Sequence, residues 1–353
     1  HTIVRVVPPG KGSAAAIVLA DPKMRQLIDW VERQGVDRNE ALRRCYDAAG
    51  SLERVRRSYL RAGPPPPAWS QPEVASSVAA AVLVGSWDTG NREDQAFVAL
   101  VSGADYARFE TAIGSWTLGS DPLMTRAGHE WRVHNRQDAW RRLEPYLRTE
   151  QLDVFVRATA EVMLEPDPRF EIPPAERWLA SMHGKRRPHS ESLRKGVADS
   201  LLYFTTMGDD RQPCYSGVRA QDWAAKCVRA IFEHRVEPNF WRRLQGNFTE
   251  LAEASPEPFL SAIEQDLREV HPQILDLFEN EGEHGGCLHA ELLWALELLA
   301  WAPVHVGRVA QILASLAAID PGGRWSNRPA RSLASMLDPR QPQCRRSEER
   351  RVG

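Results

Sequence analysis

Apolar residues recur every three or four positions through most of the chain beyond residue 20, which is the period of one buried face of an α-helix. The first such stripe comprises Met24, Leu27, Ile28 and Val31. We expect three short helices within residues 21–63, with Asp21, Asn39 and Ser51 as their N-terminal caps, because these side chains accept hydrogen bonds from the free amides of a first turn. This stretch therefore predicts a small helical domain.

Two β-branched runs, Thr2–Val7 and Ala15–Leu19, flank a loop rich in proline and glycine. They predict a hairpin or a strand pair. A phosphate-binding loop would need Gly-x-x-x-x-Gly-Lys-Ser/Thr before a helix. This chain has Arg5 at the first glycine position, Gly12 after the lysine, and a strand-like run next. We therefore predict a plain turn, and interpret residues 1–20 as a strand remnant of an upstream domain.

Four consecutive prolines open residues 64–73 and predict a stiff linker. Beyond it, residues 74–148 show the pattern of three helices followed by a hairpin that turns at Ala127-Gly128. We expect these elements at Val74–Trp87, Glu93–Val101, Tyr106–Trp116, Leu123–Arg126 and Glu130–Val133. That order is typical of a winged-helix domain, in which Trp131 of the hairpin would cover the third helix.

Residues 149–340 consist of helical stretches separated by proline and glycine, and they predict stacked helical hairpins. One internal repeat supports this, because two sets of residues are offset by 47 positions. The sets are Leu251, Pro256, Phe259 and Ala262, and Leu298, Pro303, Val306 and Val309. This period matches the paired helices of a HEAT-like repeat. Residues 341–353 lack apolar periodicity and are interpreted as a non-native tail. The predicted fold class is thus mainly α, with a small N-terminal β remnant.

Composition agrees with a globular protein and limits its partners. Of the 353 residues, 42% are apolar and 26% are charged, and no apolar run is long enough for a transmembrane helix. Lysine and arginine number 45 against 47 aspartates and glutamates, so the net charge of -2 gives no general attraction to nucleic acid or acidic membranes. The five cysteines form no CxxC pair, which favours reduced thiols and a cytoplasmic location.

One short stretch has the residue types of a metal site. His284, Cys287 and His289 offer three nitrogen or sulfur ligands, and the glycines between them would let the chain wrap around a zinc ion. No distant cysteine or histidine pair with zinc-site spacing completes the set. A solvated loop before a helix is the favoured interpretation, so we expect neither a metal nor another cofactor.

The densest positive charge lies in a loop between two predicted helices. The residues concerned are Arg177, Lys185, Arg186, Arg187, His189 and Arg194. They predict a surface for phosphate, nucleic acid or an acidic partner. The favoured interpretation is that they only stabilise the C-terminus of the preceding helix. No Gly-x-Ser-x-Gly motif or comparable cysteine signature is present, so no catalytic residue is assigned.

The winged-helix pattern also raises the question of DNA binding. Its third helix carries Arg108 and Glu110, which is too little positive charge for the phosphate contacts that dominate affinity. Arg126, His129 and Arg132 of the hairpin add little. A role in packing against protein is therefore favoured over DNA binding.

The stretch Asp320–Gly323 has a physical reading of its own. Asp-Pro-Gly-Gly stops a helix, and Asn327–Pro329 would start the next one. We expect Arg328 to point at neighbouring acids, and this segment to close the helical array.

Several short stretches resemble large bacterial, defence-associated proteins: Glu176–Trp178, Gly184-Lys185, Leu193–Gly196, Asp320–Gly323 and Asn327–Pro329. With the predicted order of elements, the chain resembles the C-terminal part of a signal-transduction NTPase of the STAND class, which includes the NACHT-type proteins. The resemblance implies that residues 21–63 are a lid, that lid and winged helix hold a nucleotide-binding core inactive, and that helical repeats sense a trigger. The Walker A and Walker B motifs of that class do not occur in this sequence.

We therefore expect a non-catalytic regulatory scaffold that senses a protein partner and acts on an NTPase core in cis. His1 opens directly into a β-type run, which reads as an internal cut with the core upstream of it. The alternatives are a helical enzyme domain with a site near residues 176–196, and a winged-helix protein that binds nucleic acid.

Overall fold

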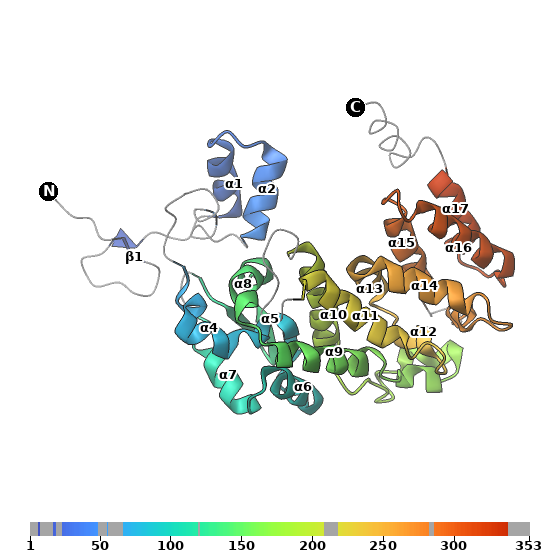
Figure 1. The fold of residues 1–353 in the computed structure, drawn as a ribbon, viewed down its shortest axis with the longest axis horizontal. Helices are drawn as coiled ribbons and strands as arrows, with labels where there is room; N and C mark the ends of the chain where they lie inside the picture. Colours follow the sequence, from blue (N-terminus) through green and yellow to red (C-terminus); the bar gives the residue numbers. More distant parts are fainter. Residues whose placement is uncertain are drawn as a thin grey trace. The chain divides into compact units, whose positions relative to one another are not determined.

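The computed structural model describes residues 6–7, 17–18, 23–48, 55, 66–118, 121–207, 218–281 and 286–337. It is mainly helical, as the sequence predicts, with one small antiparallel sheet and a short strand pair near the N-terminus (Figure 1). Contacts between residues divide the chain into two compact units, His1–Gln151 and Leu152–Gly353. Among the described residues, no helix combines the length and the apolar surface that crossing a membrane requires.

Some expectations fall on residues outside those ranges. They concern the loop after the first β run, the cap at Asp21, the third short helix apart from the helical residue Val55, the first two prolines of the linker, His284, and the tail at 341–353. These expectations stay predictions.

The N-terminal strand pair forms, but not as a hairpin. β1 (Val6–Val7) pairs with β2 (Ile17–Val18) in parallel. The hairpin alternative is therefore wrong, because a tight turn joins only antiparallel strands.

Two short helices follow, and each buries the face that its periodicity predicts. α1 (Met24–Glu32) packs against α2 (Arg38–Asp47). Their shared core contains Leu27, Ile28, Val31, Ala41 and Cys45. The cap of α2 is Asp37 and not Asn39, because the Asp37 carboxylate accepts hydrogen bonds from the backbone amides of Asn39 at 3.0 Å and of Glu40 at 3.2 Å.

The rest of the first unit contains three strands and several helices. They are η1 (Ala68–Ser70), α4 (Pro72–Val78), α5 (Ala80–Val84), β3 (Ser86–Asp88), α6 (Arg92–Ser102), α7 (Tyr106–Gly114), β4 (Met124–Ala127), β5 (Glu130–Val133), α8 (Arg136–Leu143) and η2 (Glu144–Tyr146). The predicted helix through Trp87 is too long. Gly85, with φ of 77°, ends α5, and the chain then enters β3.

The predicted linker is also shorter than expected. Trp69 of η1 is buried, and its indole N–H donates to the carbonyl of Asp121 at 3.0 Å. Pro72 then occupies the first turn of α4, a position where its missing N–H costs nothing. Of the described residues in the linker, only Pro66 precedes the packed structure, because Pro67 is already buried.

The three strands form an antiparallel sheet in the order β3-β5-β4. The predicted hairpin is confirmed: β4 and β5 meet at Gly128, whose φ of 61° suits a tight hairpin turn. Trp131 is buried as predicted, and its N–H donates to a carboxylate oxygen of Glu110 on α7 at 3.0 Å. The sheet is thereby joined to the helix that precedes it.

The second unit is entirely helical among its described residues. Its elements, with α9 crossing the border between the units, are α9 (Thr149–Met163), η3 (Pro168–Glu171), η4 (Pro174–Leu179), α10 (Glu191–Thr206), α11 (Ala220–Phe232), α12 (Phe240–Arg243), α13 (Phe248–Ala254), α14 (Pro256–Asp266), η5 (Gln273–Phe278), α15 (Ala290–Leu299), α16 (Val306–Ile319) and α17 (Pro329–Leu337).

These helices stack in pairs, as shown in yellow to red in Figure 1. α10 contacts α13, and α13 contacts α15; in the other layer α11 contacts α14, and α14 contacts α16. The successive pairs are thus α10 with α11, α13 with α14, and α15 with α16. Aromatic residues fill the interior, including Phe232, Phe240, Trp241, Phe248 and Phe259.

The 47-residue repeat describes the spacing of these pairs but not their side chains. Phe259 is buried in α14, whereas its counterpart Val306 is 39% exposed at the start of α16. Pro256 opens α14, but Pro303 lies in the turn before α16. The repeat therefore holds at Ala262 and Val309, which are both buried, and fails at Val306 and Pro303.

Two charged groups join neighbouring pairs. Arg308 of α16 binds Glu264 of α14 with both ends of its guanidinium, at 2.8 and 3.0 Å, and also Glu257 at 2.7 Å. The carboxylate of Glu291 on α15 accepts the backbone amides of Gly246 at 2.6 Å and Phe248 at 2.9 Å. It thereby caps α13 from a helix far along the chain.

We predict that Glu264→Gln lowers the free energy of unfolding by about 1 kcal/mol at neutral pH, because the ion pair with Arg308 is mostly shielded from water. The hydrogen bond from Arg308 holds the pKa of Glu264 below its ordinary 4.5, so this stabilisation is lost as pH falls through that lowered pKa. Urea denaturation at several pH values measures the effect. Glu257→Gln is the control: its carboxylate is more exposed, so its cost is smaller. A pH-independent difference for Glu264→Gln would contradict the prediction.

Candidate functional site

The predicted basic residues gather in the second unit, around η3, η4, the start of α10 and α12. Local sequence explains why η3 and η4 form there. Pro168 and Pro174 each occupy a first turn, and the Asp167 carboxylate accepts the backbone amide of Arg169 at 3.0 Å. These short helices carry the aromatic ring around which the arginines lie.

Phe170 is surrounded by three guanidinium groups. The central carbons of Arg169, Arg177 and Arg242 lie 4.7, 4.9 and 5.1 Å from the centroid of its ring. A cation over an aromatic face is attracted by the ring's negative charge, and planar guanidiniums stack on it well. We call this group, with the acids that neutralise it, the arginine network.

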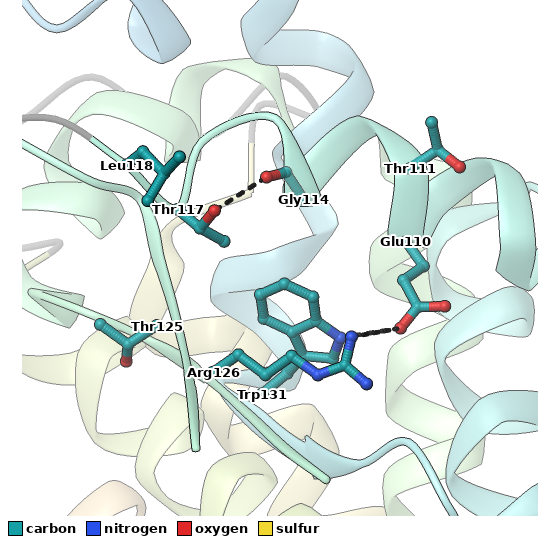
Figure 2. A pocket seen from close by; sticks show the side chains of 8 residues that line it. All are labelled: Glu110, Thr111, Gly114, Thr117, Leu118, Thr125, Arg126 and Trp131. Atoms are coloured by element: carbon teal, nitrogen blue, oxygen red, sulfur yellow. Dashed lines mark hydrogen bonds and ion pairs between the residues drawn. The ribbon is translucent and has the colours of Figure 1, made fainter. Parts of the chain in front are cut away.

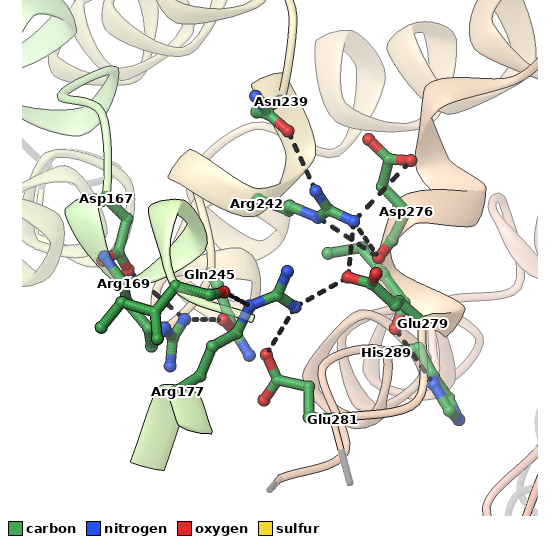
Figure 3. Close-up of polar contacts among 12 residues, drawn as sticks. Asp167, Arg169, Arg177, Asn239, Arg242, Gln245, Asp276, Glu279, Glu281 and His289 are labelled. Atoms are coloured by element: carbon green, nitrogen blue, oxygen red, sulfur yellow. Dashed lines mark hydrogen bonds and ion pairs between the residues drawn. The ribbon is translucent and has the colours of Figure 1, made fainter. Parts of the chain in front are cut away.

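Arg177 is the most deeply placed of the three, at 5% exposed. It forms ion pairs with Glu279 at 2.7 Å and with the buried Glu281 at 3.3 Å, and it donates to the carbonyl of Ile172 at 3.2 Å. Arg242 reaches the same Glu279 at 2.9 Å. Figure 3 shows both guanidiniums directed at that carboxylate, which joins η4 and α12 to the segment after η5.

Arg187 and Arg194 converge on one backbone oxygen. Both donate to the carbonyl of Arg243, the last residue of α12, at 2.8 and 3.1 Å, and Arg194 also donates to the carbonyl of Val162. Arg187 pairs in addition with Asp167 at 3.1 Å. Burial, together with the charge of Arg187, lowers the pKa of Arg194 to about 10. These two arginines therefore position α12.

The other three predicted binding residues lie nearer the surface. His189 contacts Glu165 at 2.6 Å, and Lys185 contacts Glu171 at 2.5 Å. Arg186 is exposed and has no ion pair with another described residue. The structure thus brings the six predicted residues into one region. Acids of the same region pair with Arg177, Lys185, Arg187 and His189, whereas Arg194 is held by backbone carbonyls.

Sequence reasoning missed these acids. Glu165, Asp167 and Glu171 precede the basic run by about one helix length, and that spacing was a usable signal. Glu279 and Glu281 are distant in sequence, and only the fold brings them to Arg177. The expectation that the basic run stabilises the C-terminus of the preceding helix is not met by Arg187 and Arg194, because both donate to the carbonyl that ends α12, a later helix.

Of the metal candidates, Cys287 and His289 lie among the described residues. His289 is buried and stacks on Phe278, with ring centroids 4.5 Å apart. Its ring nitrogens face the carbonyls of Leu277 and Asn327 at 3.3 and 2.8 Å. Within the described residues, no group of three or more histidine, cysteine or acidic side chains could hold a metal ion.

The thiol of Cys287, next to His289, is also poorly suited to metal binding. Cys287 lies 3.2 Å from the His289 ring, and burial raises the pKa of its thiol and lowers the pKa of the imidazole. A raised thiol pKa opposes formation of the thiolate that binds a metal. The segment instead serves packing, since Arg328 pairs with Asp320 at 2.8 Å next to Phe278, as predicted for closure of the array.

The enzyme alternative needed acids with altered pKa values beside Lys185 and Arg194. The described acids whose pKa is raised are Glu253, Asp266 and Glu291. Asp266 accepts the backbone amides of Gln273 and Ile274, and Glu291 caps α13. Asp266 and Glu291 thus hold the starts of η5 and α13.

No protein-family model, curated protein or solved structure matches this chain. Its function is therefore inferred from its own residues and geometry.

The contacts of Arg187 predict unequal effects of substituting two neighbouring arginines, Arg187 and Arg186. Arg187→Ala should lower the free energy of unfolding by about 3 kcal/mol, because it leaves Asp167 and the carbonyl of Arg243 short of a donor in a buried region. Arg186→Ala should change it by about 0.5 kcal/mol or less, as expected for an exposed side chain. Chemical denaturation followed by circular dichroism compares the two variants. Similar effects of both would contradict a structural role for Arg187.

Proposed function

We propose that this chain is a non-catalytic regulatory scaffold that senses a protein partner, and that it belongs to a larger intracellular NTPase of the STAND type. In this proposal a winged-helix domain lies in the first unit and HEAT-like helical hairpins form the second. Nucleotide binding is left to a core in cis, and this chain is assigned no cofactor of its own.

The order of elements in the first unit supports the winged-helix part of the proposal. A helical segment (α4 and α5), a strand (β3), two helices (α6 and α7) and a two-stranded hairpin (β4 and β5) follow one another. The first strand pairs with the last one, so that β5 is central. This connectivity is the one expected for a helix-turn-helix core with a wing.

The observation that carries the partner-sensing proposal is an exposed aromatic surface on the last helix pair. α15 is apolar on nearly every face, and such a helix is normally covered on all sides. Its buried face contacts α13, α16 and α17, yet Trp294 is 58% exposed. Trp301 and Val304, in the turn after α15, are also exposed.

Tryptophan is enriched among the residues that dominate protein interfaces, and stacked helical repeats provide extended binding surfaces. We call Trp294, Trp301 and Val304 the aromatic surface. It is the part of the second unit best suited to a protein partner.

The nucleic-acid alternative has less support. The arginines that would bind phosphate hold acids and carbonyls of the same unit. Lys185 and Arg186 are the two members of the cluster whose side chains are substantially exposed, and Lys185 already pairs with Glu171. Neutralising these two residues, while keeping Arg187, tests nucleic-acid retention without disturbing the fold.

We predict that the double variant Trp294→Asp, Trp301→Asp keeps the thermal stability of the wild type but binds its protein partner at least about thirtyfold more weakly, as loss of central aromatic contacts implies. The partner is first identified by affinity capture from cells that express the chain, with the variant as the reference, and its binding is then measured by calorimetry with purified proteins.

Leu100→Asp is the matched control, because Leu100 is a similarly exposed apolar residue in the other unit. Equal binding of the double variant and the wild type would remove the aromatic surface from the proposal. Salt-sensitive retention of duplex DNA, lost when Lys185 and Arg186 are neutralised, would favour the nucleic-acid alternative instead.

A further inference from the structure

A hollow of about 600 Å³ lies beside the free edge of the small sheet, between α7 and β4. Figure 2 shows its lining, with Trp131 and Arg126 on one side, Glu110 of α7 on another, and Thr117 and Leu118 at the rim. The volume is in the range of pockets that hold a small ligand or a few side chains. The aromatic surface of the second unit does not contribute to it.

The hydrogen-bond pattern of the sheet shows which backbone groups of β4 point away from β5. β5 bonds to β3 through alternate residues, because the amide of Val133 donates to Gly85 and the carbonyl of His129 accepts from Thr89. The intervening residues of β5, Glu130 and Arg132, therefore face Ala127 and Thr125 of β4.

It follows that Met124 and Arg126 direct their backbone groups away from β5. The amide of Met124 already donates to the carbonyl of Trp116 at 3.2 Å. Within the part of the chain that the structure describes, Arg126 is thus the residue of this edge whose N–H and C=O both lack a backbone partner. An open strand edge pairs readily with an added extended chain.

The side chains around the hollow define the chemistry of such a chain. Leu118 is 88% exposed at the rim, and Trp131 forms an aromatic wall, so an apolar side chain fits between them. Arg126 lies over the Trp131 ring at 5.3 Å, and its one carboxylate contact among the described residues is Glu110 at 4.0 Å. That distance is too long for a hydrogen bond, and Glu110 is already bonded to the indole of Trp131.

We infer that this edge binds an extended acidic segment of a partner protein. The segment adds as a strand beside β4, exchanges two backbone hydrogen bonds with Arg126, inserts an apolar side chain against Trp131 and Leu118, and places a carboxylate on the guanidinium of Arg126. The inference rests on the proposed function, because the bound segment belongs to a protein partner. It adds that the first unit recognises an apolar side chain next to a carboxylate.

A second copy of this chain is a poorer occupant. Antiparallel pairing of two β4 edges around Arg126 would place the two Arg126 side chains opposite each other, and like charges facing across strands are destabilising. The single open residue would also give that dimer no more than one pair of backbone hydrogen bonds.

The test uses the full chain as bait for a phage-displayed library of random short peptides. We expect enriched peptides to share an apolar residue with an acidic residue close to it. A fluorescein-labelled copy of the best peptide then reports affinity by anisotropy for the wild type and for each variant.

Arg126→Ala should weaken binding about tenfold through loss of the charge pair. Arg126→Pro should abolish it, because proline removes the N–H as well, and proline is tolerated on an edge strand whose N–H faces outward. Leu118→Asp should also weaken it. Arg132→Ala is the control, since Arg132 lies on the same hairpin but directs its backbone groups towards β4 and is exposed.

Hydrogen exchange keeps the test independent of the stability of the proline variant. In the wild type, the bound peptide should slow exchange within β4 and leave α16 unchanged. The inference would be overturned if no acidic peptide were enriched. It would also be overturned if Arg126→Ala and Arg126→Pro bound the peptide as tightly as the wild type and the peptide left exchange in β4 of the wild type unchanged. Concentration-dependent dimers lost in Arg126→Pro would assign the edge to a second copy instead.

This outcome is separable from that of the proposed function. Loss of partner binding in the Trp294→Asp, Trp301→Asp variant tests the aromatic surface in the second unit. If no peptide binds at β4, the result for the aromatic surface still stands. If the partner does not bind the aromatic surface, the peptide result at β4 still stands.

Discussion

Buried positive charge in proteins must be matched by acids or carbonyl oxygens, and the second unit depends on that constraint. Arg177, Arg187 and Arg194 are all buried, and each is held by an acid or a backbone oxygen that comes from another element. Removing such charges from water is expensive, and only close hydrogen-bonded partners compensate for it. The arrangement of η3, η4, α12 and the segment after η5 is therefore tied to these contacts.

This constraint also bears on function. A guanidinium that binds Glu281 or the carbonyl of Arg243 is not available to a phosphate or to an acidic partner. The charge-rich loop that attracts attention in the sequence is largely internal, while the exposed groups suited to binding are apolar and aromatic. The proposed scaffold function follows from that contrast, since Trp294 and Trp301 are exposed on the last helix pair, next to a face that packs on α13 and α17.

The two units offer different kinds of surface. The second presents the outer face of stacked helices, where apolar contact would dominate. The first presents a strand edge, where backbone hydrogen bonds set the direction of an added chain and Arg126 selects its charge. A nearby loop makes the edge short, because the backbone amide of Met124 already donates to the carbonyl of Trp116. A short edge of this kind limits unwanted pairing while leaving room for a specific segment.

Local interactions decided how much of the fold could be predicted. The helical period of α1 and the hairpin at Gly128 depend on neighbouring residues, and the sequence alone determined them. β3 escaped prediction, because its apolar run continues that of α5 and only pairing with β5 makes it a strand.

The candidate site was likewise predicted only in part. The clustering of Arg177, Lys185 and Arg187 is visible in the sequence, but their acidic partners are not. Glu279 and Glu281 lie about a hundred residues from Arg177, and nothing in their local sequence marks them. Periodicity and capping act over a few residues and are therefore readable from the sequence. Charge pairing, the open edge of β4 and the exposure of Trp294 depend on which distant segments the chain brings together, so only the tertiary structure decided them.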